Sequence, residues 1–420
     1  MKIANEYGNI TSIQENTDFS VKQITDICNN IGPRKPGSPE ELKAQKFMEE
    51  DLKPISDKTE IEDFTLHRQG FMGFIPFTVC MGIGATFVNW FGKPIIAFIM
   101  CILAFIPLIL EFLMYKEFDD FLFPKQTSHN LIATKAPKGE TKQRIIMVGH
   151  ADSQFEWPIN LLLGGLKAKL MVEVPAVVGL VITTIFSIIC TFVSHGAAAR
   201  TIEGGSRWFF VTLFIIGCIF VPFEFSFIFF QSWTKSVPGA SDNLSGCYVG
   251  ISTLKALREA GIDMNQTEIR VICSGSEEAG LRGAKAYARA HEKELKDIPT
   301  VCIGLDTFRD LEDMAVYDRD LSGTLQHDWG AKYLIKNAAE NCGYDLKFES
   351  IYIGACDAAA FEQQGIPSTG FAAMDPAPAD YYHTRNDTPE NLRPEAIEAA
   401  IEIMVEACCM YDKEGLPQKD

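Results

Sequence analysis

Histidine is scarce in this chain, and basic residues are fewer than acidic ones. Seven histidines occur among 420 residues, and 38 lysines and arginines stand against 55 aspartates and glutamates, for a formal net charge of −17. Nucleic-acid binding needs a basic surface that neutralises phosphates, so this balance argues against a nucleic-acid partner. Because histidines are few, those that stand in motif-like settings among carboxylates become informative.

Two further patterns are missing. None of the twelve cysteines forms a Cys-x-x-Cys pair, and four lie within apolar segments (Cys80, Cys101, Cys190 and Cys218). We therefore expect most cysteines to be small buried apolar residues rather than a disulfide framework. Residues 1–19 are polar and acidic, with no basic stretch leading into an apolar one, and we expect no cleaved signal peptide.

The chain does contain four long apolar stretches, at residues 71–90, 94–114, 174–194 and 208–230. A helix needs about 20 apolar residues to cross the hydrocarbon core of a bilayer, and each stretch is close to that length. Buried core helices of a soluble domain are the alternative reading, but such helices rarely run this far without a polar face. We expect two transmembrane hairpins, at residues 71–115 and 170–230.

Two hairpins would leave all the polar segments on one side of the membrane. Near the spans, that side carries more lysine and arginine than the two hairpin tips, which hold Lys93, Arg200 and Arg207. Positive residues are enriched on the cytoplasmic side of membrane proteins. The expectation is a multi-pass protein of the cell membrane, in contact with the lipid bilayer, with its soluble domain in the cytoplasm.

The remaining segments, 1–70, 116–169 and 231–420, read together as one α/β domain. Apolar runs at 130–134, 144–148, 268–273, 300–305 and 366–371 are typical of buried strands. Helical patterns occupy 243–260, 278–295, 325–341 and 394–411. This alternation predicts a doubly wound, mostly parallel mixed sheet with helices on both faces, whose ligands bind beyond the carboxyl ends of the strands.

Carboxylates and histidines stand at the edges of these predicted elements. They are His150, Asp152, Asp242, Glu277, Glu278, Asp306 and His383. Two divalent cations bring four positive charges, which three carboxylates (Asp242, Glu278 and Asp306) and a hydroxide would balance. The imidazoles of His150 and His383 would complete a ligand set of nitrogen and oxygen atoms, which suits zinc. Asp242, among small residues at a helix start, is the expected bridge between two ions.

Two acidic residues are expected to act without binding metal. Glu277 precedes the proposed ligand Glu278 at a strand-to-helix turn, where the two side chains diverge, so Glu277 is placed to act as a general base. Asp152 lies two residues after His150 and would accept its second imidazole N–H. Each residue alone has an ordinary structural reading, such as a surface glutamate pair or a helix cap. Their joint occurrence in this order favours a metal centre.

Five motifs resemble those of the co-catalytic zinc exopeptidase family, which includes bacterial leucine aminopeptidases, glutamate carboxypeptidases and glutaminyl cyclases. They are His-x-Asp at 150–152, Ser-Asp-Asn-x-Ser-Gly at 241–246, Gly-Ser-Glu-Glu-x-Gly-x-x-Gly at 275–283, Asp306 after an apolar strand, and His-Thr-x-x-Asp-Thr at 383–388. The resemblance implies that His150, Asp242 and Asp306 hold one zinc ion, that Asp242, Glu278 and His383 hold the other, and that Glu277 is the base.

The resemblance also has departures. In the family a short loop joins His-x-Asp to the bridging aspartate, whereas here an apolar hairpin intervenes. Where many members read Ser-Asp-His, this chain has Cys356-Asp357-Ala358, which leaves substrate contacts from that loop open. His129 and His327 match nothing in the pattern and are interpreted as structural.

The resemblance implies a membrane-anchored di-zinc aminopeptidase that hydrolyses N-terminal residues from peptides through a metal-bridging water and the base Glu277. A glutaminyl cyclase-like acyltransferase with one zinc and a non-catalytic scaffold are the alternatives. The second hairpin follows the segment after Asp152 and ends shortly before Asp242. Both of its ends are therefore tied to the site, so the active-site edge would face the bilayer. Apolar or membrane-derived peptides are the expected substrates, with simple anchoring as the other reading of the hairpins.

Overall fold

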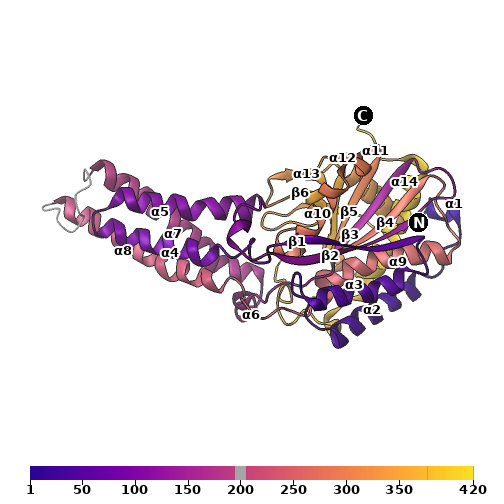
Figure 1. The fold of residues 1–420 in the computed structure, drawn as a ribbon, viewed down its shortest axis with the longest axis horizontal. Helices are drawn as coiled ribbons and strands as arrows, with labels where there is room; N and C mark the ends of the chain where they lie inside the picture. Colours follow the sequence, from indigo (N-terminus) through magenta and orange to yellow (C-terminus); the bar gives the residue numbers. More distant parts are fainter. Residues whose placement is uncertain (194–204, 376, 420) are drawn as a thin grey trace.

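A mixed sheet occupies the centre of the computed structural model, which describes residues 1–193, 205–375 and 377–419 (Figure 1). Within these residues the strands are β1 Lys58–Leu66, β2 Gln126–Lys135, β3 Gln143–His150, β4 Thr267–Ser274, β5 Thr300–Phe308, β6 Met314–Asp320, β7 Leu325–Gln326, β8 Lys347–Ser350 and β9 Ser368–Ala373. Strands β4, β3, β5 and β9 are adjacent and parallel. Antiparallel pairs flank this centre, with β1 and β2 beside β4 and β6 beside β9. The predicted α/β class is confirmed.

Helices cover both faces of the sheet, because successive side chains of a buried strand point in opposite directions. In β3, Ile145 and Met147 belong to one hydrophobic core, and Ile146 and Val148 to another. The first core includes residues of α1 Ala4–Tyr7, α2 Ile13–Asn30, α3 Pro39–Leu52, α9 Gly246–Glu259, α12 Trp329–Cys342 and α14 Pro394–Glu414. The second includes residues of α10 Arg282–Ala290, α11 Glu292–Asp297 and α13 Ala358–Gln363.

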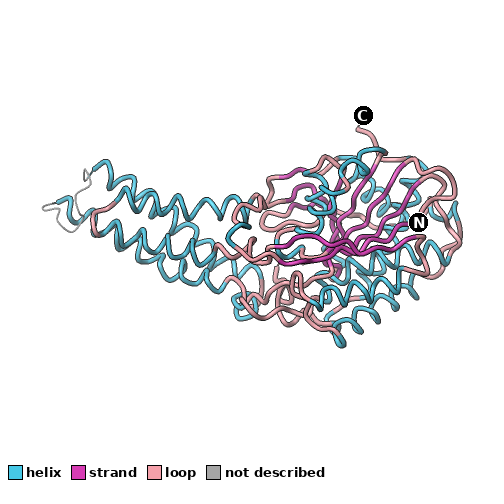
Figure 2. Tube along the Cα trace, in the orientation of Figure 1, coloured by secondary structure: helices cyan, strands magenta, loops and turns pink. Residues whose placement is uncertain are grey.

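Four apolar helices project from one end of this domain as a bundle (Figures 1 and 2). They are α4 Ile75–Trp90, α5 Pro94–Pro107, which continues as a π-helical turn at Leu108–Leu113, α7 Leu166–Val193 and α8 Gly205–Ser226. The short helix α6 Pro158–Leu163 precedes α7. Residues at the base of the bundle, among them Phe74, Phe227 and Phe230, belong to the second core of the α/β domain. Bundle and sheet are therefore packed together rather than joined by free linkers.

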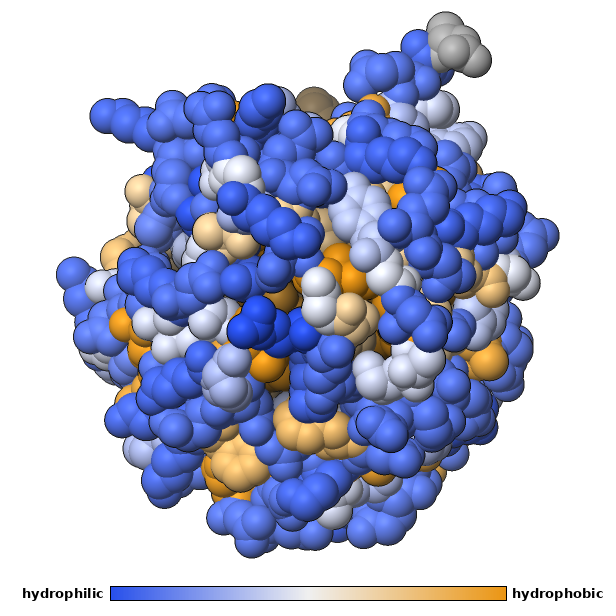
Figure 3. All heavy atoms as spheres, turned by 90° about the vertical axis from the view of Figure 1, so that its right-hand side faces the viewer, coloured by the Kyte–Doolittle hydropathy of each residue, from blue (hydrophilic) through white to orange (hydrophobic). Residues whose placement is uncertain are grey.

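The bundle has polar contacts inside and apolar side chains outside. The Asn89 amide donates to the Ser187 hydroxyl at 2.8 Å, between α4 and α7. Ile96, Ile185 and Ile219, by contrast, are more than half exposed. This distribution is the one that a lipid environment favours, because small polar residues mediate helix contacts in membranes. The face at the opposite end of the molecule is mostly hydrophilic (Figure 3).

Three helical segments among the described residues are long and apolar enough to cross a membrane, namely Pro94–Leu113, Leu166–Phe192 and Val211–Phe229. They suggest membrane association. The first predicted span, 71–90, is shorter than expected, because α4 begins only at Ile75. Phe71 and Met72 are buried in the second core instead of continuing the helix. Most of the second expected tip, residues 195–207, lies outside the described residues.

Other boundaries differ from the sequence-based expectation for local reasons. The helix expected at 278–295 is broken, since Gly280 and Leu281 take left-handed conformations with φ of +98° and +62° and α10 starts at Arg282. The helix expected from 325 begins at Trp329, because the Asp328 carboxylate caps it by accepting the Ala331 N–H at 2.9 Å. Strands β1, β6, β7 and β8 were not anticipated.

Candidate metal centre

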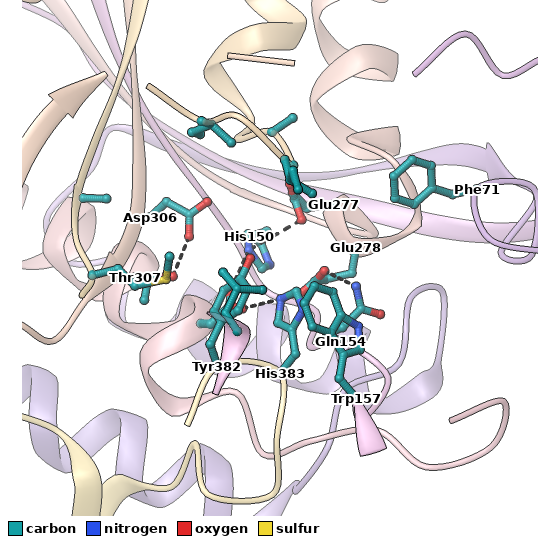
Figure 4. Close-up of a pocket in the computed structure, with 18 of the residues that line it drawn as sticks. Phe71, His150, Gln154, Trp157, Glu277, Glu278, Asp306, Thr307, Tyr382 and His383 are labelled. Atoms are coloured by element: carbon teal, nitrogen blue, oxygen red, sulfur yellow. Dashed lines mark hydrogen bonds and ion pairs between the residues drawn. The ribbon is translucent and has the colours of Figure 1, made fainter. Parts of the chain in front are cut away.

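The carboxyl ends of the parallel strands bring the predicted ligands together (Figure 4). His150 ends β3, Asp306 lies near the end of β5, and Glu277 and Glu278 form a short 3-10 turn, Glu277–Ala279, just after β4. Asp242 lies in the turn Ala240–Ser245 that leads into α9, and His383 lies in the loop after β9. Each of these side chains lines one cavity. The sheet edge therefore places all six residues around a shared space.

Asp242 stands between the two histidines. Its Oδ1 lies 3.2 Å from Nε2 of His150, and its Oδ2 lies 2.8 Å from Nε2 of His383. The backbone N–H groups of Ser241 and Asp242 donate to the Asp387 carboxylate at 2.8 and 3.0 Å. A carboxylate that turns one oxygen to each imidazole, on a turn fixed from behind, fits a bridge between two ions.

Glu278 completes the half of the site that contains His383. Its Oε1 lies 3.2 Å from Nε2 of His383, and its Oε2 accepts a hydrogen bond from the Gln154 amide. Ligand atoms of His150, Asp242 and Glu278 all lie within 4.8 Å of one another. Oδ2 of Asp242 and Oε1 of Glu278 belong to buried side chains, and both face the same imidazole nitrogen of His383. Buried oxygens of this kind need a positive partner, and the nitrogen and oxygen donors suit zinc.

Asp152 contacts both the predicted base, Glu277, and a predicted ligand, His150. Its carboxylate accepts the backbone N–H groups of Glu277 and Glu278 at 3.0 and 3.1 Å. The same carboxylate lies 3.4 Å from Nδ1 of His150, as predicted from the two-residue spacing. Oε2 of Glu277 is 3.7 Å from Nε2 of His150. One carboxylate thus orients the imidazole of His150 and the turn that carries both glutamates.

Asp306 lies on the same cavity but apart from the close cluster. Its Oδ1 accepts a hydrogen bond from the Thr307 hydroxyl at 2.9 Å, and Figure 4 shows this pair on the far side of His150 from His383. Burial raises the pKa of Asp306 to about 7, although His150 opposes the shift. Asp306 therefore lines the same cavity as His150 without belonging to the close cluster of His150, Asp242 and Glu278.

The charges of the site are unbalanced without cations. Burial raises the pKa of Glu277 well above its usual range, and it also raises the pKa of Glu278. Burial lowers the pKa of His383, but Glu278 and Asp242 outweigh it and bring the value to about 9. Burial also lowers the pKa of His150, but Glu277, Asp152 and Asp242 outweigh it and raise the value well above normal. Buried carboxylates in excess over two imidazoles are a set that divalent cations would neutralise.

Three residues without a predicted role support the backbone around the site. Asp387 fixes the turn of Asp242, and its position in the His-Thr-x-x-Asp-Thr motif was the available signal. Glu41 accepts the Ser276 N–H at 2.7 Å, just before Glu277. The buried Arg34 donates to the carbonyl groups of Ala151, Gly32, Pro238 and Gly239 at 2.7, 3.2, 2.6 and 2.8 Å. Arg34 therefore links the segment before the second hairpin to the segment after it.

The cavity has apolar walls that come from the base of the bundle. Phe71 and Met72 precede α4, Phe112 and Tyr115 lie at the end of the first hairpin, and Leu166 begins α7. Trp157 adds a further wall, and its ring meets the imidazole of His383 edge to face, with the centroids 4.2 Å apart. The backbone N–H of Trp157 also donates to the His383 carbonyl at 2.8 Å. The metal-ligand cluster lies between the sheet edge and the bundle.

Comparisons with known proteins agree with this fold. The structure is similar to BSAP, a zinc aminopeptidase from Bacillus subtilis (TM-score 0.54, 17% identity, 96% of each chain covered). It also resembles an aminopeptidase from Aneurinibacillus sp. strain AM-1 (TM-score 0.53, 16% identity, 100% of this chain and 96% of the other). A glutaminyl cyclase from Fimbriiglobus ruber is similar as well (TM-score 0.52, 14% identity, 94% and 95% covered). No curated protein sequence matches the chain.

The fold is similar to that of zinc aminopeptidases and glutaminyl cyclases of known structure. Residues 229–408 match the model of peptidase family M28. The matched range contains Asp242, Glu277, Glu278, Asp306 and His383. His150 and Asp152 precede it, on the other side of the second hairpin, and reach the site through β3.

Proposed function

We propose that this protein is a membrane-anchored di-zinc aminopeptidase. The observation that carries the proposal is Asp242, whose two oxygens face His150 and His383 separately. That geometry supports one ion on each side of the carboxylate. His150 and Asp306 would hold the first zinc ion, and Glu278 and His383 the second, with Asp242 shared between them.

Zinc at these positions would polarise a scissile carbonyl and lower the pKa of a water molecule. The remaining chemistry belongs to the chain. Glu277 takes a proton from the attacking water and delivers it to the leaving amine. The Asp152 carboxylate keeps Glu277 in place by accepting a hydrogen bond from the backbone N–H of Glu277. Buried apolar side chains such as Trp157 exclude bulk water from the reacting carbonyl.

Metal analysis of the full-length protein in detergent tests the proposal. We expect two zinc ions at the Asp242 centre, and hydrolysis of aminoacyl fluorogenic substrates that a chelator abolishes and added zinc restores. The reason is that the carboxyl and imidazole groups gathered at the site are the ligand types that zinc binds. Full activity of metal-free protein would contradict the proposal.

A glutaminyl cyclase-like reaction is the second candidate, because glutaminyl cyclases also share the fold. A peptide with an N-terminal glutamine distinguishes the two reactions, since a peptidase releases free glutamine and a cyclase forms pyroglutamate. The proposed ligands His150 and Asp306 would hold an ion in addition to the one held by Glu278 and His383. Two ions favour the peptidase over a cyclase with one zinc. A non-catalytic scaffold is disfavoured, because the chain retains every proposed ligand and the base.

We further propose that the substrates are apolar or membrane-derived peptides. The cavity walls formed by Phe71, Phe112 and Leu166 come from the base of the bundle, which supports a reacting centre close to the membrane surface. Catalysis in the cytoplasm, favoured by the basic residues near the spans, is part of the same proposal. Anchoring alone would give no preference for apolar substrates.

A comparison of liposomes with detergent tests this substrate class. We expect kcat/KM for a short apolar peptide to rise about tenfold in liposomes. Each CH2 that enters the bilayer favours the transfer of the peptide from water by about 0.8 kcal/mol, and this transfer raises the local concentration of substrate. A polar peptide of the same length serves as the matched control and should show no such rise. Equal changes for both peptides would remove the substrate proposal and leave the peptidase proposal intact.

A further inference from the structure

A second cluster of metal-binding residue types lies away from the Asp242 centre. Asp320 ends β6, His327 follows β7, and Cys356 precedes α13. All three are buried, with exposures of 0%, 3% and 1%. Oδ2 of Asp320 is 3.1 Å from Nε2 of His327 and 3.0 Å from Sγ of Cys356. One ligand atom of each residue lies within 4.8 Å of the other two.

The chemistry of this cluster suits a single zinc ion. A thiolate and a carboxylate together supply two negative charges, which balance one divalent cation in a buried place. Zinc binds thiolate, imidazole and carboxylate ligands together, and magnesium or calcium would not select the thiolate. Nδ1 of His327 faces the Glu362 carboxylate at 3.9 Å. A proton on Nδ1 would leave the lone pair of Nε2 free for a metal, as in other carboxylate–histidine–metal arrangements.

We propose that Asp320, His327 and Cys356 form a structural zinc site, separate from the catalytic pair. The competing arrangement is a hydrogen-bonded triad in which Asp320 accepts from a histidine and a thiol. Asp320 already accepts the Leu321 N–H at 2.6 Å and the Cys356 N–H at 3.3 Å. A triad would therefore occupy all of the roughly four acceptor positions of one carboxylate, while a cation would use Oδ2 as a ligand and hold the thiolate and imidazole beside it.

The site would fix a wall of the catalytic cavity. Ile351, Ile353, Gly354 and Ala355 line that cavity and lead directly into Cys356. The Ile351 N–H donates to the Arg319 carbonyl at 2.9 Å, next to Asp320. Zinc at Asp320 would hold this segment at its Cys356 end, so that it faces the metal pair in one conformation. The role is that of a positioning site, not of a second reaction centre.

Cobalt substitution of the full-length protein in detergent tests the proposal. The catalytic cluster offers only nitrogen and oxygen ligands, so a thiolate-to-cobalt charge-transfer band in the near ultraviolet would report on Cys356. We expect the band in the wild-type protein. We also expect Cys356→Ala to lose it, with one fewer metal ion per chain. Cys302→Ala, at another buried cysteine, is the matched control and should keep both the band and the metal content.

Two results would overturn the proposal. One is cobalt-loaded wild-type protein without the charge-transfer band, which needs no variant to fold. The other is a band that persists in Cys356→Ala. His327→Gln gives a second check, because it should also lower the metal content by one ion and weaken the band. These readouts do not depend on peptidase activity, so the failure of either proposal leaves the other testable.

Discussion

Replacement of Glu277 by glutamine is expected to lower kcat about 10²- to 10⁴-fold, the range that a general base contributes. Glutamine has the same shape but cannot take a proton from water. The zinc content should stay unchanged, because Glu277 is the proposed base and not one of the proposed ligands. Steady-state hydrolysis of an aminoacyl substrate, together with metal analysis of the same preparation, measures both quantities.

The neighbouring residue provides the control for this experiment. Glu278→Gln should lose zinc as well as activity, since Oε1 of Glu278 faces His383 at 3.2 Å. Two adjacent glutamates would then give different results from the same chemical change. A wild-type rate in Glu277→Gln would show that the base lies elsewhere, and loss of zinc in that variant would make Glu277 a ligand.

Replacement of Arg34 by methionine is expected to destabilise the protein by about 3 kcal/mol or more, since each buried acceptor left without a partner costs about 1–3 kcal/mol. The guanidinium donates to four backbone carbonyl groups, and methionine would leave these acceptors buried without partners. Ala151 and Gly239, two of the acceptors, lie next to the motifs of His150 and Asp242. Denaturant or thermal unfolding in detergent would measure the shift.

Arg385→Met is the matched control, because the Arg385 side chain is 59% exposed and pairs with Glu156 at 2.6 Å. An exposed ion pair contributes little to stability, because water screens it. Arg34→Lys should give an intermediate loss, since a single ammonium group cannot reach four carbonyl groups in the planar arrangement of a guanidinium. Equal shifts for Arg34→Met and Arg385→Met would contradict the role assigned to Arg34.

The sequence was sufficient for the parallel strands and for the residues that line the site. Strands such as β3 and β5 are buried on both faces, so they appear as continuous apolar runs. The proposed ligands follow these runs directly, which made their common edge predictable. The edge strands β1 and β8 were missed because most of their side chains are exposed or only partly buried and leave no such run. Strand β6 was missed because only its first half is apolar.

Residues that act through the backbone gave less signal. Arg34 reaches carbonyl groups about 120 and 205 positions away, and no local pattern reveals a bond of that kind. The break after Glu278 was missed because Leu281, an ordinary helix-forming residue, adopts a left-handed conformation there. His327 was interpreted as structural, since its partners Asp320 and Cys356 lie in separate segments that only the fold brings together.

The position of the second hairpin has a consequence for biogenesis. His150 is synthesised before α7 and α8, and Asp242, Glu278, Asp306 and His383 are synthesised after them. On a ribosome, four of the five proposed ligands therefore emerge only when both helices of the insertion have left the exit tunnel. If the bundle enters the bilayer as proposed, the nascent chain acquires its hydrolytic centre at the membrane.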